Sequence, residues 1–203
     1  ATGLLCCVAI WVKSTVTLIL FGIGLSSLAG ALMALVTNFA PNPFYLSDMI
    51  TWMLGSVANR SLLDIALVLP FMLAGLLLLL SQRKGLTLLS LGEDTASTLG
   101  LSLTTTRICV VLGAGLATGA AVSLAGVIGF VGIVTPHLVR PLVNYEPGKT
   151  IIPSAVLGGV FLVLIDIGVR IISTNVELKI GVLAALVGAP IFIWIASKSG
   201  RHE

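Results

Sequence analysis

The stretch LLDIALVLPFMLAGLLLLL, residues 62–80, decides the fold of this chain. Its nineteen residues include a single charged one, Asp64, near the beginning. Coiled as an α-helix it would be about 28 Å long, which matches the hydrocarbon core of a bilayer. A helix on the surface of a soluble protein would need a polar face, and this stretch has none. Residues 62–80 are therefore predicted to cross a membrane.

Similar apolar blocks lie on both sides of this stretch. Helix-breaking or polar residues separate them, for example Pro43 and residues 81–84. A shorter piece, residues 46–54, is amphipathic. We predict an all-α fold, a polytopic transmembrane helical bundle in which residues 1–203 form a single domain. The six predicted spans are residues 15–36, 62–80, 104–124, 127–143, 151–172 and 180–197.

The composition excludes an ordinary soluble protein. Of the 203 residues 57% are hydrophobic and 9% are charged, with a mean hydropathy of +1.15, whereas soluble domains carry about a quarter charged residues. The formal charge of +3 does not indicate nucleic-acid binding, because the lysines and arginines are scattered singly between apolar blocks. The bilayer is the expected solvent for most of the chain.

The sequence holds no pattern typical of an enzyme or a metal site. Cys6, Cys7 and Cys109 lie inside apolar runs without CxxC spacing, which predicts neither disulfides nor a zinc site. No G-x-x-x-x-G-K-[ST] motif is present, so the chain has no P-loop to hold ATP. We predict no catalytic residue, no metal ligand and no bound cofactor, and any energy from ATP must come from a partner.

The beginning of the chain favours a fragment. Residues 1–12 are apolar but too short to cross a bilayer before Lys13, and the chain begins with Ala1. A signal peptide would need a basic segment first and a cleavage site afterwards, and neither is present. We expect residues 1–12 to be the tail of a preceding helix in a longer protein.

The distribution of basic residues predicts the orientation. Lysine and arginine are retained on the cytoplasmic side of membrane proteins. Placing the connection 81–103 in the cytoplasm leaves only Arg60, Arg170 and Lys179 outside. The eight cytoplasmic basic residues are then Lys13, Arg83, Lys84, Arg107, Arg140, Lys149, Lys198 and Arg201.

Within this connection, residues 90–101 are predicted to form a short helix. Ser90 and Glu93 have the spacing of a capping box, Asp94 adds a second acid to the first turn, and Gly100 is placed to stop the helix. Ser102 can cap the span that follows. The segment is either a docking surface for an ATP-hydrolysing partner or an ordinary capped surface loop, and the residues alone favour neither.

The stretch GVIGFVGIVTPHLVR, residues 126–140, predicts an interrupted span. Gly129, Gly132 and Pro136 weaken a helix, and such irregular backbone is tolerated only where protein or water surrounds it. His137 and Arg140 lie one helical turn apart. They either belong to a hinge beside a pathway, or the histidine bonds a backbone carbonyl and the arginine reaches to the interface. Pro190 similarly interrupts the last span.

Asp166 and Arg170 form the most distinctive pair of charges within a span. Their i,i+4 spacing puts them on one helix face, so they are predicted to pair. The predicted orientation places Arg170 near the outer surface, where it can meet an external carboxylate while Asp166 orients it. A purely structural ion pair is the alternative.

Together these motifs resemble the iron-siderophore and cobalamin permease family of ABC importers, the FecCD-type membrane subunits of type II importers. The resemblance covers essentially the whole chain and corresponds to the last six of the family's ten spans. It rests on residues 91–101, Gly129-Phe130-Val131-Gly132, Pro136-His137-x-x-Arg140, Asp166-x-x-x-Arg170, Glu177-Leu178, Gly181 and Gly188-Ala189-Pro190-Ile191-Phe192.

The resemblance implies a permease of the bacterial inner membrane that moves a ferric siderophore, or failing that haem or cobalamin, by alternating access. It implies two ATPase subunits, a second permease copy, as homodimer or heterodimer, and an external substrate-binding protein. Arg170 matches an arginine that docks the binding protein, and residues 15–54 match segments that line and gate the pathway. Residues 92–99 match the coupling helix that seats in the ATPase, so the predicted coupling residues are Gly92, Glu93, Asp94, Thr95, Ala96, Leu99 and Gly100. The predicted structural or gating residues are Gly129, Gly132, Pro136, His137, Arg140, Asp166 and Pro190.

The chain departs from the family pattern at Lys179, where the family usually has a proline after Glu-Leu. An ion-coupled secondary transporter is the alternative function, since such proteins also use broken helices and midplane charges. It would need acids at the midplane, and Asp166 is the only acid clearly inside a span and has Arg170 as a partner. A non-transporting scaffold would not explain a capped helix next to a broken span.

Overall fold

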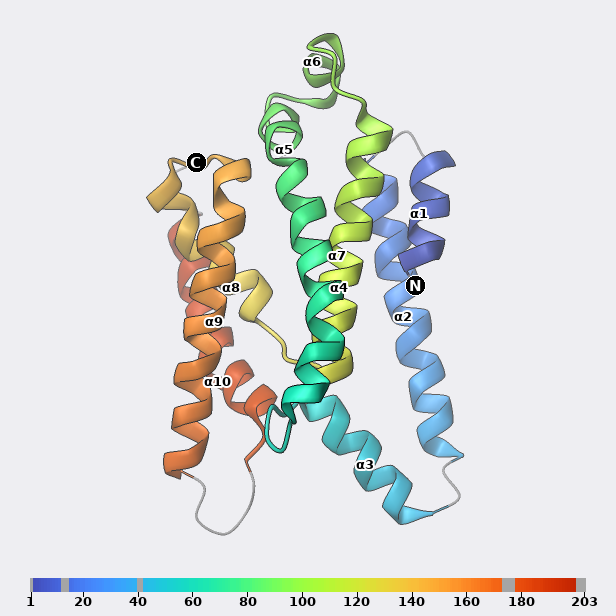
Figure 1. Cartoon of the computed structure of the whole chain (residues 1–203), viewed down its shortest axis with the longest axis vertical. Helices are drawn as coiled ribbons and strands as arrows, with labels where there is room; N and C mark the ends of the chain where they lie inside the picture. The colour runs from blue at the N-terminus through green and yellow to red at the C-terminus, as the bar shows by residue number, and fades with distance from the viewer. Residues whose placement is uncertain (1, 12–14, 40–41, 173–177, 200–203) are drawn as a thin grey trace. The chain divides into compact units, whose positions relative to one another are not determined.

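The computed structural model describes residues 2–11, 15–39, 42–172 and 178–199, and the regular elements of this part are all helices, joined by turns and short irregular segments (Figure 1). Lys13 and Glu177 lie outside these residues. The elements in chain order are α1 Thr2–Trp11, α2 Thr15–Asn38, α3 Pro43–Leu54, α4 Leu62–Ser81, α5 Arg83–Leu89, α6 Glu93–Thr98, α7 Leu103–Ala125, α8 Val131–Val139, the 3-10 helix η1 Arg140–Val143, α9 Pro147–Ile172 and α10 Ile180–Ser199.

Five of these helices are long and apolar enough to cross a membrane. They are α2, α4, α7, α9 and residues Ile180–Lys198 of α10. Many of their large side chains are exposed, and α2 buries none of its residues. A surface so rich in leucine and isoleucine suits lipid or other membrane helices and not water.

Residues 127–143, predicted as a shorter and interrupted span, do not form a helix long enough to cross a membrane by itself. The helical part there is α8 followed directly by η1, residues Val131–Val143, which extend about 20 Å, roughly two thirds of the hydrocarbon core. The backbone turns away from helical geometry between Ala125 and Val131, and Gly126 and Phe130 have φ of 73° and 65°.

The helix α3 begins at Pro43, three residues before the start predicted for the amphipathic piece at residues 46–54. Pro43 occupies the first helical position, where its missing N–H has no cost. The side-chain oxygen of Asn42 accepts a hydrogen bond from the N–H of Phe44 at 3.0 Å, which caps the helix start.

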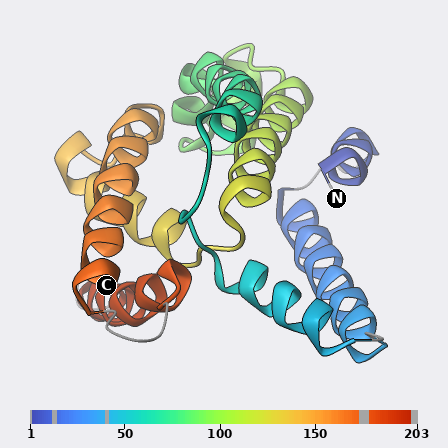
Figure 2. The same cartoon turned by 60° about the horizontal axis from the view of Figure 1, so that its bottom comes forward.

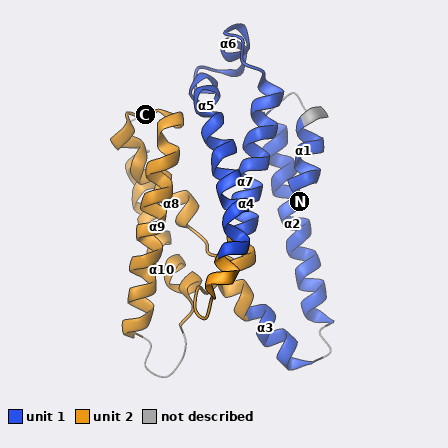
Figure 3. Cartoon of the chain, in the orientation of Figure 1, with its two compact units in different colours: residues 1–50, 66–120 blue, residues 51–65, 121–203 orange. Residues whose placement is uncertain are grey.

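The chain divides into two compact units (Figure 3). Unit 1 contains residues 1–50 and 66–120, and unit 2 contains residues 51–65 and 121–203. In unit 1, α4 and α7 run side by side in both views (Figures 1 and 2) because Gly75 and Gly113 face each other. A Cβ on Gly75 would lie 2.6 Å from the backbone oxygen of Gly113, so these two backbones can approach only without side chains.

Unit 2 is built on α8, α9 and α10, which lie next to one another in both views (Figures 1 and 2). Its buried core contains Ile165, Ile180 and Ala184, with Phe161 and Leu183 packed against them. The end of α3 joins this unit through a hydrogen bond, since the N–H of Val127 donates to the oxygen of Trp52 at 3.4 Å, and just after α3 the N–H of Ser56 donates to the oxygen of Ala125 at 2.7 Å.

Candidate functional site

The short helix α6 ends as its sequence predicts. Gly100 adopts a φ of 86°, and its N–H donates to the oxygen of Ser97 at 3.0 Å. The N–H of Leu101 donates to the oxygen of Ala96, also at 3.0 Å. These two bonds form a Schellman motif, which requires a residue with positive φ and favours glycine. The predicted helix stop at Gly100 is confirmed.

The beginning of α6 differs from the prediction, because the helix covers Glu93–Thr98 and not residues 90–101. Ser90 does not cap it: the Ser90 hydroxyl donates to the oxygen of Thr87 at 2.7 Å and closes the end of α5. Gly92, with φ of 97°, takes the N-cap position without a side-chain bond. Because this hydroxyl bonds a carbonyl of the preceding helix α5, it does not cap α6, although Ser90 and Glu93 have the spacing of a capping box.

The two faces of α6 have different surroundings. Ala96 is fully buried within unit 1, and Glu93 is half-buried. Asp94, Thr95 and Leu99 are exposed, Leu99 by 59%. Within the described residues, the carboxylate of Asp94 makes no hydrogen bond or ion pair. The outer face of α6 therefore offers one acid and one large apolar side chain to a partner.

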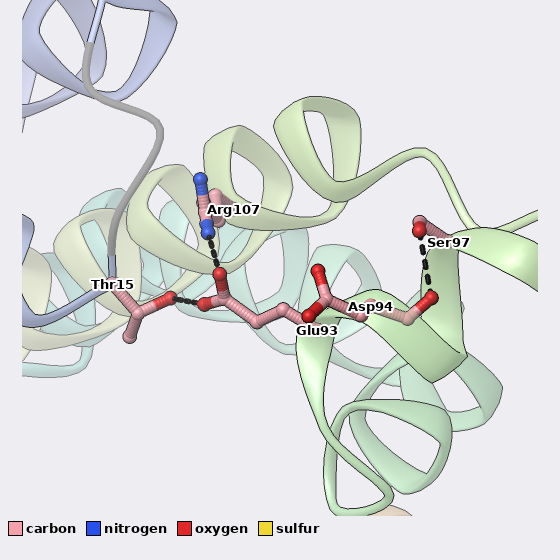
Figure 4. Close-up of polar contacts among 5 residues, drawn as sticks. All are labelled: Thr15, Glu93, Asp94, Ser97 and Arg107. Atoms are coloured by element: carbon pink, nitrogen blue, oxygen red, sulfur yellow. Dashed lines mark hydrogen bonds and ion pairs between the residues drawn. The ribbon is translucent and has the colours of Figure 1, made fainter.

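Glu93 bridges α6 to two other helices of unit 1 (Figure 4). One carboxylate oxygen lies 2.8 Å from the Nη2 atom of Arg107 on α7, and the other accepts a hydrogen bond from the hydroxyl of Thr15, the first residue of α2. The side chain of Arg107 is 7% exposed and that of Glu93 is 36% exposed. The hydrogen bonds from Thr15 and then Arg107 lower the pKa of Glu93, so the carboxylate is charged at physiological pH.

Sequence reasoning missed the roles of Thr15 and Arg107. Arg107 is the one charged residue in the described helix α7, and a charge within an apolar helix requires a partner. The two acids of the adjoining connection, Glu93 and Asp94, were the available candidates. That signal could have suggested the ion pair, whereas Thr15 is 78 positions away from Glu93 and carried no signal.

Asp166 and Arg170 pair on α9 as predicted. The Nε atom of Arg170 donates to Asp166 Oδ2 at 2.8 Å, and the Arg170 side chain is 70% exposed. The pair lines a pocket of about 300 Å³ in unit 2, together with Ser56, Asn59 and Lys179. The pocket therefore holds two cationic side chains and one carboxylate.

The interruption predicted in residues 126–140 is present, but Gly129 and Gly132 do not cause it. A Cβ on either glycine would meet no atom within 4 Å, and neither has a positive φ. Gly126 does, and a Cβ there would overlap the backbone oxygen of Trp52. Close packing of residues 51–55 against residues 125–128 thus explains the break.

After the break, His137 and Arg140 lie in different environments. The Nδ1 atom of His137 donates to the oxygen of Ile133 at 2.8 Å, which is the structural alternative considered for this histidine. Its ring lies edge-on to Phe192, with centroids 5.9 Å apart. Arg140 and Pro136 line a different pocket of about 300 Å³ with Tyr145 and Thr150.

A third pocket, of about 640 Å³, brings Gly129 and Pro190 together. Phe130 and Gly181 contribute to its wall, and nearly all of its lining is apolar. No group of three or more histidines, cysteines, aspartates or glutamates in the described residues could hold a metal ion. The described residues thus present a polar pocket at Arg170, an apolar one at Pro190 and an exposed helix α6.

A family model matches residues 2–198, and its description is the FecCD transport family. The chain belongs to the FecCD transport family. The ABC transporter permease protein YvrB of Bacillus subtilis is 38% identical over 188 residues, which are 93% of this chain and 53% of that protein. The vitamin B12 import system permease protein BtuC of Salmonella typhi is 37% identical over 193 residues, 93% of this chain and 57% of BtuC.

A solved structure agrees with this FecCD membership. It is described as an inward-facing conformation of a transporter of metal-chelate type. It superimposes with a TM-score of 0.88 and 31% identity, covering 97% of this chain and 63% of that one. This FecCD chain is thus a multi-pass membrane protein that spans about half the length of the curated relatives it matches.

Proposed function

We propose that this chain forms the C-terminal part of the permease subunit of an ABC importer for metal chelates. Its cargo is a ferric siderophore, haem or a cobalamin-type compound, and a separate ATPase supplies the energy. Membership of the FecCD family over residues 2–198 supports the class of transporter. The described residues contain no P-loop motif, which is consistent with ATP hydrolysis on a partner.

The observation on which this proposal depends is the exposed face of α6. Leu91 and Leu99 are 60% and 59% exposed in the connection between α4 and α7, beside the exposed acid Asp94. Two leucines at the tip of a water-facing connection favour a protein partner, since apolar side chains at the centre of an interface contribute much of its stability. In the proposed complex the ATPase covers this face.

The proposed topology places the connection 82–102 in the cytoplasm. Residues 126–143, with α8 and η1 as their helical part, form the fourth of six passes, and these six correspond to the last six of ten spans. α2 and α3 line and gate the pathway against a second permease copy. ATP-driven closure of the two ATPase subunits displaces α6 and switches access from one side of the membrane to the other.

A reconstitution experiment tests the proposed function. The complete permease, its ATPase and its binding protein are placed in liposomes, and uptake of labelled ferric siderophores, haem and cobalamin is measured with and without ATP. Uptake of one chelate class that requires both ATP and the binding protein supports the proposal. Uptake driven by a sodium or proton gradient without the ATPase would instead support a secondary transporter.

Arg170 is proposed to dock the binding protein through an external carboxylate. Arg170→Glu places two acids in the pocket and replaces attraction by repulsion, so we expect the Kd for the binding protein to rise about five- to tenfold at low salt. Surface plasmon resonance on the complex in nanodiscs measures this change. Arg60→Glu is the matched control, because Arg60 is an exposed cation on the same proposed side but lies outside the pocket. An equal effect of the two variants would refute a specific role for Arg170.

A further inference from the structure

The helix α6 has a glycine at each end. Gly92 and Gly100 flank it with φ of 97° and 86°, and a Cβ on either one would meet no atom within 4 Å. The six residues of α6 are thus joined to α5 and α7 through two glycines with open surroundings. Apart from the packing of the buried Ala96, α6 needs a further attachment, because otherwise a force applied to it would swing it about these glycines and leave the long helices in place.

Glu93 supplies such an attachment. Its two carboxylate oxygens are used separately, one for Arg107 of α7 and one for Thr15 of α2 (Figure 4). Arg107 lies in the second turn of α7 and Thr15 begins α2, so both contacts are at helix beginnings. A carboxylate at the beginning of α2 is also favoured by the helix dipole. One side chain therefore holds three helices of unit 1.

The attachment is expected to persist while α6 moves. The guanidinium of Arg107 is almost fully buried, and a buried cation that loses its anion is strongly destabilised. The neighbouring acid, Asp94, is exposed and has no described partner. Glu93 and Asp94 therefore have different roles although they are adjacent: Glu93 faces inward and Asp94 faces a partner.

We propose that Glu93 is a positioning residue that transmits movement of α6 to α7 and α2 during the transport cycle. This inference rests on the proposed function, because it needs an ATPase that moves α6. It assigns to the ion pair with Arg107 and the hydrogen bond from Thr15 the task of preventing α6 from rotating about its two glycines. Loss of Glu93 should then allow ATP hydrolysis to continue while less substrate is moved for each ATP.

The test uses charge exchange in the complete transporter, reconstituted with its ATPase and binding protein. Glu93→Lys and Arg107→Glu each place like charges together, and the double variant restores an ion pair with reversed polarity. Glu93→Gln keeps the size and an acceptor oxygen for Thr15, and covers the case in which the reversals do not fold. Lys84→Gln is the control, because Lys84 is an exposed charge in the same connection, at the beginning of α5, and has no assigned role in binding. Substrate moved and ATP hydrolysed are both measured, together with ATPase binding.

We expect Glu93→Lys and Glu93→Gln to lower the substrate moved per ATP roughly tenfold while ATPase binding is retained. The double exchange should recover most of the ratio, and Lys84→Gln should leave it unchanged. A wild-type ratio in Glu93→Gln, or no recovery in a well-folded double exchange, would overturn the inference. Neither result would affect the proposed function, which fails only if the wild-type complex shows no ATP-dependent uptake.

Discussion

Gly126→Ala is expected to prevent accumulation of folded protein in the membrane. Gly126 has φ of 73°, and an alanine in this left-handed conformation costs about 1–2 kcal/mol. The added methyl group would also overlap the backbone oxygen of Trp52, and relief of such a clash in a packed region costs about 1–3 kcal/mol more. The position cannot adjust easily, because the N–H of Val127 also donates to the Trp52 oxygen at 3.4 Å.

Gly55, which contacts Gly126, makes the destabilisation by Gly126→Ala larger than at an ordinary turn. A Cβ on Gly55 would lie 2.6 Å from the backbone oxygen of Val127, so residues 51–55 and 125–128 are in backbone contact on both sides. A shift that makes room for the added methyl group at position 126 would therefore create a new clash at Gly55. The two costs together lower the free energy of unfolding by about 2–5 kcal/mol, a large part of the stability of a typical domain.

The yield of monodisperse protein and its thermal midpoint, both measured by fluorescence-detected size exclusion, test this prediction. Gly119→Ala is the matched control, since Gly119 lies in α7, a Cβ there would meet nothing within 4 Å, and its helical backbone accepts alanine. We expect the control to match or exceed the wild-type midpoint. A Gly126→Ala protein with a wild-type midpoint would show that the backbone contact with residues 51–55 is not required.

The second large effect is expected for Leu99→Asp. Leu99 is 59% exposed at the end of α6, so an aspartate there should not disturb the folding of unit 1. If the ATPase covers this face, the substitution buries a charge at the centre of the interface, and we expect the ATPase affinity to fall at least about 30-fold. Uptake should fall with it, because hydrolysis is no longer connected to the permease.

Co-purification of the ATPase with the tagged permease measures this loss. Leu99→Met keeps the apolar surface and the approximate volume, and it should retain the ATPase at the wild-type level. Size exclusion of the permease alone distinguishes a lost interface from a lost fold. Full retention of the ATPase by Leu99→Asp would contradict the assignment of α6 as the coupling helix.

The features predicted correctly are those encoded locally. The span at residues 62–80 agrees with α4 within one residue, because a long run of almost entirely apolar side chains leaves a helix in lipid as the only favourable structure. The pairing of Asp166 with Arg170 follows from helix geometry alone, and the helix stop at Gly100 follows from the positive φ of a Schellman motif.

The features predicted incorrectly depend on competition between neighbours or on contacts distant in sequence. Ser90 has an ideal capping-box spacing, but α5 precedes it and uses its hydroxyl. The break before α8 was predicted, but from Gly129, Gly132 and Pro136, whereas it arises at Gly126 from contact with Trp52, which is far away in the sequence. Glu93 was assigned to the docking face with Asp94, and only the positions of Arg107 and Thr15 show that it points inward.

The side of the membrane on which residues 82–102 lie tests the account most directly. A single cysteine is introduced at position 99 or at position 59 in a variant whose three native cysteines are replaced by serine, and a membrane-impermeant maleimide is added to intact cells and to inside-out vesicles. The account predicts that Leu99→Cys reacts only in inside-out vesicles and is protected by bound ATPase, whereas Asn59→Cys reacts only in intact cells. Labelling of position 99 from outside intact cells would place α6 on the wrong side for any ATPase and would contradict the coupling role of Glu93 and the docking role of Arg170 together.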